Sequence, residues 1–261
     1  MRAKGLIAAG GEATRLGELT RVVNKHLLPV GDRPMIYYPL QLLERAGIEE
    51  VMVVTGQGHA GQVIDLLGNG RLSQRGTSEP LFDLDLTYKV QVEAGGIAQV
   101  VGMAESFAGD DDLIVCLGDN IFEYAEADAI RSFVESDDGA AVFVKDVPDP
   151  ERFGVVVYGD DGRVVDVVEK AGVVDLRYGS PPSRDAVVGL YCYSPDVFEL
   201  IRGLEPSSRG ELEITDVNRH YAESGTLACH RVSGWWEDAG TQESLREIGA
   251  LIERTGVNKL A

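Results

Sequence analysis

The sequence has few basic residues for its size. Its 261 residues include 24 Lys and Arg against 43 Asp and Glu, a formal net charge of −19 at pH 7. A protein of this charge repels polyanions, so nucleic acid and anionic membranes are not expected partners. An anionic ligand would have to be bound by basic side chains gathered at its site, so each Arg or Lys beside a suggestive motif is informative.

Cysteine is also scarce, and long apolar runs are absent. Cys116, Cys192 and Cys229 lack Cys-x-x-Cys spacing and lie in or near apolar segments, which predicts reduced core residues. No run approaches the roughly 18 apolar residues of a membrane span, and the apolar stretch near the N-terminus is too short for a secretory signal. We therefore expect a cytoplasmic protein.

Internal repeats, low-complexity tracts and linkers rich in Ser or Pro are absent as well, which predicts one continuous domain. Short apolar runs alternate with helical periodicity through the first half, the pattern of parallel strands joined by crossover helices. The expected strands there are 5–10, 51–56, 86–92 and 112–120, and the expected helices are 34–48, 59–70 and 96–107. The prediction is an α/β fold, a Rossmann-like, mostly parallel sheet flanked by helices.

The second half is more mixed. It predicts strands at 140–147 and 185–194, a hairpin within 153–170, and helices at 195–204, 213–225 and 242–255. The turn Gly159-Asp160-Asp161-Gly162 has the chemistry of a hairpin connection. We therefore expect an antiparallel β insertion in the otherwise parallel fold.

A glycine-rich turn follows the first predicted strand. Gly10 and Gly11 can bring backbone N–H groups close to a phosphate. The dinucleotide pattern Gly-x-Gly-x-x-Gly is absent, and Gly17 is not followed by the Lys-Ser/Thr of a P-loop. The turn therefore predicts a ligand that carries phosphate but is bound by neither a dinucleotide fingerprint nor a P-loop.

Gly11, Thr14 and Arg15, with Lys25 ten residues after Arg15, stand in register with the motif Gly-x-Gly-Thr-Arg and its following lysine. In these residues the sequence resembles the sugar nucleotidyltransferases, also called nucleotide-sugar pyrophosphorylases; Ala13 replaces the usual second glycine. Within that family the resemblance is greatest to the glucose-1-phosphate thymidylyltransferases. It is carried, in order and spacing, by KHLLPVGDRPMIYYPL, LGDNIF, DPERFGVVVY, VVGLYCYSPDVFEL, RGELEITDVNRHYAESG and WEDAGTQESL.

The resemblance covers nearly the whole chain and implies the nucleotide-diphospho-sugar transferase fold over 1–261. It implies a nucleotide-binding half at about 1–120 and a sugar-phosphate-binding half at about 121–261. The implied reaction condenses dTTP with glucose 1-phosphate to dTDP-glucose and pyrophosphate, by in-line attack of the sugar phosphate on the α-phosphorus. Both reactants are anions, so the site must neutralise charge and align them.

The resemblance also implies a role for each site residue. Arg15, Lys25 and Asp119 would be catalytic, and Asp119 and Asp238 would hold Mg²⁺, completed by phosphate oxygens and water. The implied nucleotide-binding residues are Ala9, Gly10, Gly11, Thr14, Arg15, Gln91 and Gly96. The implied sugar-phosphate-binding residues are Gly154, Glu169, Lys170, Gly189 and Arg209. Phe153 replaces a tyrosine that is usual in the family, so a phenolic hydrogen bond to the ligand is lost.

Several alternatives remain open. The Gln91 amide can read thymine and uracil equally well. The same chemistry with UTP or CTP, or with another hexose 1-phosphate, is a first alternative. A catalytically silent module that binds nucleotide sugars is a second alternative, although such a module has no need of Arg15, Lys25, Asp119 and Asp238 together. A nicotinamide-dependent oxidoreductase is disfavoured by the first loop. The family implies a homo-oligomer, a dimer or tetramer, and among the histidines only His26 is expected near the site.

Overall fold

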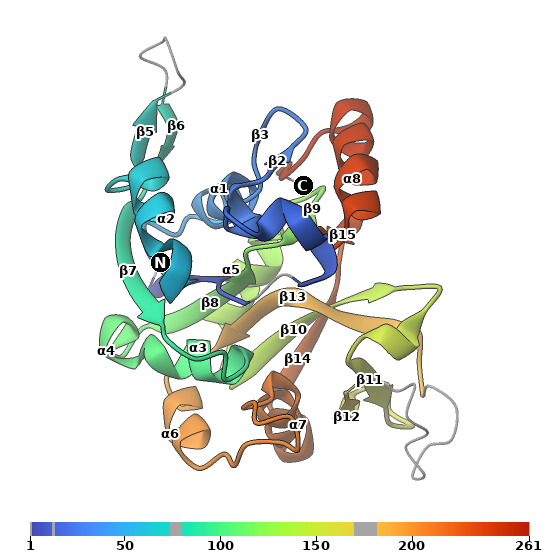
Figure 1. Cartoon of the computed structure of the whole chain (residues 1–261). Coiled ribbons are helices and arrows are strands. Elements are labelled where there is room, and N and C mark those ends of the chain that lie inside the picture. The colour runs from blue at the N-terminus through green and yellow to red at the C-terminus, as the bar shows by residue number, and fades with distance from the viewer. Residues whose placement is uncertain (1, 12–13, 74–79, 170–181, 261) are drawn as a thin grey trace.

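The computed structural model describes the chain except residues 1, 12–13, 74–79, 170–181 and 261, and describes only the backbone of Thr14 and Arg15. Its described part is built on a nine-stranded sheet (Figure 1). The strand order is β12-β11-β13-β8-β1-β4-β7, and β10 and β14 continue from β13 off this path. The strands are β1 (Ala3–Ala9), β4 (Glu50–Gly56), β7 (Asp85–Gln91), β8 (Asp112–Leu117), β10 (Ala140–Asp146), β11 (Val155–Tyr158), β12 (Val164–Val168), β13 (Asp185–Tyr193) and β14 (Leu227–Arg231).

The first half of the chain forms the parallel part of the sheet. Strand β1 pairs in parallel with β4 and with β8, and β4 pairs in parallel with β7. The helices of this half are α1 (Tyr37–Arg45), α2 (Ala60–Leu67), α3 (Ile97–Met103) and α4 (Glu105–Ala108). The predicted parallel α/β organisation is confirmed.

The second half adds the expected antiparallel strands. Strand β13 is antiparallel to β8, β10 and β11, and β11 forms the predicted hairpin with β12. Its helices are α5 (Ala127–Val134), α6 (Val197–Arg202), α7 (Ile214–Ser224) and α8 (Gln242–Thr255). Helix α8 has the predicted bounds because Thr241 and Ser244 form a capping box at its start. Strand β14, parallel to β10, was not predicted.

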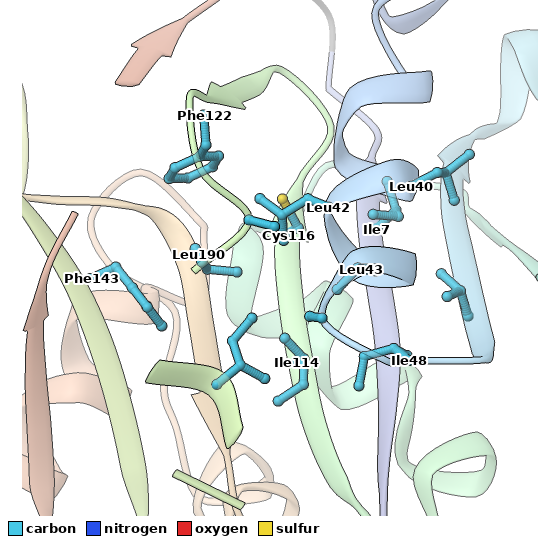
Figure 2. Packing of buried hydrophobic residues seen from close by; sticks show 14 of the residues in the cluster. Ile7, Leu40, Leu42, Leu43, Ile48, Ile114, Cys116, Phe122, Phe143 and Leu190 are labelled. Atoms are coloured by element: carbon cyan, nitrogen blue, oxygen red, sulfur yellow. The ribbon is translucent and has the colours of Figure 1, made fainter. Parts of the chain in front are cut away.

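The hydrophobic core lies on both faces of the sheet, because side chains of a strand alternate between the faces. In β1, Leu6 and Ile7 are fully buried in two different clusters. The Ile7 cluster, shown in Figure 2, includes residues of α1, α2 and α5, among them Leu40, and the β8 residues Ile114 and Cys116. The Leu6 cluster is completed by α3, α6 and α7.

Short elements account for the main differences from the predictions. Pro34 was expected in the first turn of a helix; it lies instead in β3 (Arg33–Pro34), which pairs with β2 (Pro29–Val30), and α1 begins only at Tyr37. Gly31, at φ +62°, allows the tight turn between these two strands. The other short elements are η1 (Thr14–Thr20), η2 (Lys25–Leu27), η3 (Gln57–His59), η4 (Pro150–Arg152), β5 (Arg71–Ser73), β6 (Pro80–Asp83), β9 (Asn120–Phe122) and β15 (Trp236–Asp238).

The three cysteines are free, as predicted; Cys116 and Cys192 are buried and Cys229 is half-buried. Within the part of the chain that the structure covers, no helix combines the length and apolar character that crossing a bilayer requires.

Candidate functional site

The parallel strands bring the predicted loops together. Ala8 lies opposite Leu117 in the β1–β8 pair, and Gly56 lies opposite Gln91 in the β4–β7 pair. The carboxyl ends of these strands therefore meet at one edge of the sheet, where open α/β sheets bind ligands. The glycine turn after β1, Asp119 after β8 and Gln91 at the end of β7 all lie at this edge.

A cavity of about 410 Å³ opens at the same edge, within the size range of ligand pockets. Both halves of the chain line it. Of the predicted site residues, it is lined by Gly10, Gly11, Lys25, Gln91, Gly96, Asp119, Gly154, Glu169 and Arg209. The structure thus gathers into one cavity nine residues that are spread over about 200 positions of sequence.

The remaining predicted residues are placed differently. Ala9, Gly189 and Asp238 are not among the described residues that line this cavity. Lys170 and the side chains of Thr14 and Arg15 lie outside what the structure describes. The next described element after the glycine turn is the short 3-10 segment η1 rather than an α-helix.

Lys25 and Asp119 form an ion pair inside the cavity, between the Lys25 ammonium and Asp119 Oδ2. Each side chain is only 14% exposed. Burial, the largest single influence, raises the pKa of Asp119, but the charge of Lys25, the neighbouring His26 and the hydrogen bonds from Lys25 and Asn120 together outweigh it and hold that pKa well below its usual range. Asp119 is therefore an anion at neutral pH, able to bind a cation.

Asn24 fixes the segment that carries Lys25. Its Oδ1 accepts a hydrogen bond from the His26 backbone N–H at 2.9 Å and lies 2.7 Å from His26 Nδ1. Its Nδ2 donates to the Ala9 carbonyl at 3.3 Å and to Thr55 Oγ1 at 3.4 Å. The buried Asn24 amide thus ties the segment to β1 and β4. Ala9 therefore acts on the site through its carbonyl, as an anchor for the lysine segment.

His26 is 1% exposed, and its ring lines the cavity. Burial, together with the neighbouring Lys25 charge, lowers the pKa of His26 to about 3. The ring is therefore neutral at physiological pH, which leaves Lys25 as the cation of this segment. The lack of a side chain at Gly118 makes room for it, because a Cβ there would lie 2.6 Å from His26 Cδ2.

Gln91 lies against the glycine turn. A Cβ at Gly10 would be 2.7 Å from Gln91 Oε1, so a larger residue there would push this amide aside. Gln91 Nε2 donates to Gln99 Oε1 at 2.6 Å, and that oxygen also accepts the Gly95 N–H at 3.1 Å. Gly96, at φ +90°, starts α3 in a conformation that favours glycine. This end of the cavity offers amide and backbone groups suited to the edge of a nucleobase.

A second part of the cavity lining, which we call the Arg209 end, carries Arg209, Glu211 and Glu213. Arg209 Nη2 donates to both carboxylate oxygens of Glu213 at 2.9 Å, and it lies 3.7 Å from Glu169 Oε1 and 3.9 Å from Glu211 Oε2. Glu169 Oε2 accepts a hydrogen bond from Thr215 Oγ1 at 2.5 Å. Carboxylates accept the hydrogen bonds of hydroxyl groups, and a guanidinium suits a phosphate, so this end fits a phosphorylated sugar.

Gly154 lies beside Glu169, where a Cβ would come within 3.3 Å of Glu169 Oε2. Phe153, which stands where the family usually has a tyrosine, packs edge-on against Trp236 with ring centroids 5.6 Å apart. Arg152, a cation that the sequence reasoning missed, also lines the cavity and donates to Asp149 Oδ2 at 2.6 Å. This rim therefore adds a cation near the proposed sugar-phosphate end.

Of the two predicted metal ligands, Asp119 directly precedes β9 and Asp238 is the last residue of β15. Strand β15 pairs with β9 so that Asp238 is opposite Asn120, and the Ala239 N–H donates to the Asp119 carbonyl at 2.8 Å. Among the described residues there is no cluster of three His, Cys, Asp or Glu side chains able to hold a metal. Two carboxylates fit Mg²⁺, which prefers oxygen ligands and keeps several waters or phosphate oxygens. The donor set is therefore suited to a cation that also binds the substrate.

A second cavity of about 420 Å³ adjoins the first across Gly11, Lys25, Gln91 and Ala94. His59, from η3, lines it. Among the described histidines, His26 lines the first cavity, as expected, and His59 lines the adjoining one. Lys25 borders both cavities, so one cation can contact groups bound on either side of it.

Sequence reasoning missed the residues that hold the predicted ones in place. Asn24 directly precedes Lys25, and Asn120 directly follows Asp119. Their position next to a charged site residue indicates that they lie close to the site. It does not indicate which groups their side-chain amides bind. Tyr191, Glu211, Glu213, Thr215 and Asn218 line the cavity as well, and their segments had been recognised without a role for these side chains.

Comparison with known proteins agrees with this geometry. Residues 4–255 match the family model described as nucleotidyl transferase. A glucose-1-phosphate thymidylyltransferase of Neisseria meningitidis is 41% identical over 254 residues, which are 96% of this chain and 82% of that protein. The low-salt glycan biosynthesis nucleotidyltransferase Agl11 of Haloferax volcanii is 37% identical over 95% of this chain, which spans 66% of its length.

Solved structures show the same fold. A protein described as a glucose-1-phosphate thymidylyltransferase from Bacillus anthracis, in complex with sucrose, has a TM-score of 0.85 and 41% identity, with 98% of each chain covered. A UDP-glucose pyrophosphorylase solved with UDP-glucose has a TM-score of 0.82 at 24% identity, covers 97% of this chain and 99% of its own, and supports the fold alone. The family match, the relatives and the cavity at the sheet edge agree: the chain belongs to the nucleotidyl transferase family.

Proposed function

We propose that the protein condenses dTTP with glucose 1-phosphate, giving dTDP-glucose and pyrophosphate. One observation carries the proposal: a single cavity joins an amide-rich end around Gln91, the Lys25–Asp119 pair and an acidic and basic end around Arg209. The cavity can bind a nucleobase and a sugar phosphate around one pair of charged residues. Relatives that carry the name of this activity support the choice of substrates.

Lys25 lines the same cavity and would neutralise charge at the α-phosphate. Asp119 and Asp238 would hold Mg²⁺, which when bound acts as a Lewis acid on phosphate oxygens. By the family resemblance, Arg15 and Thr14 would bind the triphosphate and Lys170 the sugar phosphate. All three rest on the sequence, because their side chains lie outside the described structure.

In-line displacement requires the attacking and leaving oxygens on opposite sides of the α-phosphorus. We place the sugar phosphate at the Arg209 end, where Gly154 and Glu169 also lie. The pyrophosphate would then leave on the far side of Lys25, towards the second cavity. This arrangement needs no nucleophilic side chain, since the sugar phosphate itself attacks.

The two halves of the chain would bind different substrates. Residues of about 1–120 would bind the nucleotide, and residues of about 121–261 would bind the sugar phosphate. Asp119 lies where the two halves meet, and the Mg²⁺ that it would hold would contact both substrates. The Gln91 amide suits thymine and uracil equally, so base selection is a property of the whole site.

Pyrophosphate release tests the proposal. The protein is incubated with Mg²⁺ and glucose 1-phosphate, with dTTP, UTP, CTP, ATP and GTP compared in parallel. Release with dTTP well above the other nucleotides is expected. Preference for UTP or CTP would keep the chemistry and change the nucleotide. No release with any nucleotide, repeated with other hexose 1-phosphates, would leave the catalytically silent binding module as the better interpretation.

A further inference from the structure

The side chain of Asn120 lies at the junction of three strands. It is 4% exposed, and its Oδ1 accepts the Gly189 N–H of β13 at 2.9 Å and the Trp236 Nε1–H of β15 at 2.7 Å. Its Nδ2 donates to Asp119 Oδ1 at 3.1 Å. The two accepted bonds settle which end of the amide is the oxygen, so the NH₂ group points at Asp119.

Both oxygens of the Asp119 carboxylate are consequently engaged. Oδ1 accepts from Asn120, and Oδ2 accepts from Lys25. Two hydrogen bonds on the two oxygens fix the plane of a carboxylate, which otherwise rotates freely about its terminal torsion. The remaining lone pairs of Asp119 then point in a set direction.

Gly189 makes this arrangement possible. A Cβ at Gly189 would lie 2.5 Å from Asn120 Cγ and 2.6 Å from Oδ1, far closer than atoms of different residues approach. The resemblance gives Gly189 a backbone role toward the sugar phosphate. Its N–H is instead bound to Asn120, so the glycine acts on the site through that amide.

Asn120 also connects the two proposed metal ligands. It is the residue opposite Asp238 in the β9–β15 pair, and it directly follows Asp119 in the chain. The Trp236 indole, two residues before Asp238, is bound to the same Asn120 oxygen. The separation of the two aspartates therefore depends on how Asn120 is held between β13 and β15.

We propose that Asn120 is a positioning residue for the metal-binding carboxylate: it orients Asp119 towards the cation and fixes Asp119 relative to Asp238. The inference rests on the proposed function, which supplies the divalent cation. Residues bonded to metal ligands affect metal affinity although they never touch the ion, and their loss typically weakens binding about 10- to 100-fold. Asn120 belongs to this class of residue.

The test measures cation binding directly. Mn²⁺ is titrated into the full-length protein with dTTP and without sugar phosphate, and free Mn²⁺ is followed by electron paramagnetic resonance. Asn120→Ala is expected to bind Mn²⁺ at least about tenfold more weakly than the unaltered protein. Trp235→Phe is the matched control: it removes an indole hydrogen bond to Thr255 Oγ1 and none to Asn120, so its Mn²⁺ affinity should equal that of the unaltered protein.

Thermal melts accompany each variant. If Asn120→Ala does not fold, Asn120→Ser retains a hydroxyl acceptor for one of the two donors and gives the same readout. Unchanged Mn²⁺ affinity in a folded Asn120 variant with a lowered melting temperature would show a purely structural role and overturn the inference. Absence of Mn²⁺ binding by the unaltered protein would overturn it as well.

Failure of the inference and failure of the proposed function can be told apart. Pyrophosphate release by the unaltered protein together with full Mn²⁺ affinity in the Asn120 variant rejects only the positioning role. Silence with every nucleotide, combined with weakened Mn²⁺ binding in the variant, rejects the reaction and supports the positioning role.

Discussion

The ammonium group of Lys25 is hydrogen-bonded to Asp119 Oδ2, a carboxylate that lies 94 residues further along the chain. The pair joins the segment after the glycine turn to the end of β8, and both side chains are largely shielded from solvent. Removing the cation from a buried carboxylate strongly destabilises the folded protein. Substitution of either residue of this pair is therefore costly. The relationship connects the proposed nucleotide site to the proposed metal site.

Lys25→Ala is therefore expected to lower turnover by about 100-fold or more, because it removes a cation from the reacting phosphate. It should also lower the melting temperature, since Asp119 loses its partner. Steady-state pyrophosphate release and thermal melts measure the two effects. Lys145→Ala, which alters a lysine bonded to the Gly234 carbonyl, is the control and should keep full turnover. Near-normal turnover in Lys25→Ala would contradict the assigned role.

Gly10→Ala should weaken nucleotide binding. The new methyl group would fall 2.7 Å from Gln91 Oε1 and displace the amide that we assign to the base. We expect the KM for dTTP to rise about tenfold, equivalent to ~1.4 kcal/mol, with the KM for glucose 1-phosphate little changed. Gly61→Ala in α2 is the control, because a Cβ there meets nothing within 4 Å. An unaltered KM for dTTP in Gly10→Ala would argue against Gln91 as the base contact.

Arg209→Ala should act on the other substrate. The guanidinium is the described cation nearest Glu169, and its loss leaves Glu169, Glu211 and Glu213 unneutralised at this end of the cavity. We expect the KM for glucose 1-phosphate to rise at least about tenfold, while the KM for dTTP changes little. Arg202→Ala, which removes an exposed arginine paired with Glu105, is the control. A rise in the KM for dTTP alone would reverse our assignment of the two ends.

The stability of the protein should depend on Asp112 in a pH-dependent way. Burial, with a smaller contribution from Asp111, raises the pKa of Asp112 from 3.8 to about 6. The folded state then binds the proton more tightly than the unfolded state, so this group costs stability as pH rises from about 4 to 6, and the full cost persists above pH 6.

Asp112→Asn should consequently stabilise the protein at pH 7.5, on the order of 1 kcal/mol after allowance for solvent screening. The gain should shrink as pH falls below 6 and vanish below about pH 4. Denaturant unfolding at several pH values measures it, with Asp110→Asn, on the exposed preceding turn, as control. A gain of equal size at every pH would exclude the titration of Asp112 as its cause.

The parts of the fold that the sequence predicted well are those with strong local signals. The predicted strand at 51–56 is a mostly apolar run and forms β4. Helix α8 matches its predicted range because its capping box, Thr241 and Ser244, lies within four consecutive residues. Strand β14 was missed because its residues are only half-buried and give no clear alternation. The residues around Pro34 read as the start of a helix locally, but pairing with β2 placed that proline in a strand.

The same division holds for the site. Gly10, Gly11 and Asp119 could be predicted from the glycine turn and a strand end, Lys25 and Gln91 from the family resemblance, and all five line the cavity. The contacts of Asn24 and Asn120 could not, because an amide gives no sequence signal of its partners. Their bonds run to residues 31 and 116 positions away, Thr55 and Trp236 respectively.

The sequence by itself determined the elements, the glycine turn and the charged residues available for binding, because these depend on short-range patterns of burial and backbone preference. Only the tertiary structure decided which of these residues meet. The pairing of β9 with β15 set Asp238 beside Asp119, and the close approach of β13 set Gly189 against Asn120. Such contacts follow from strand order and register, which bring together residues distant in the chain, and a shift of one residue would turn each side chain to the other face of the sheet.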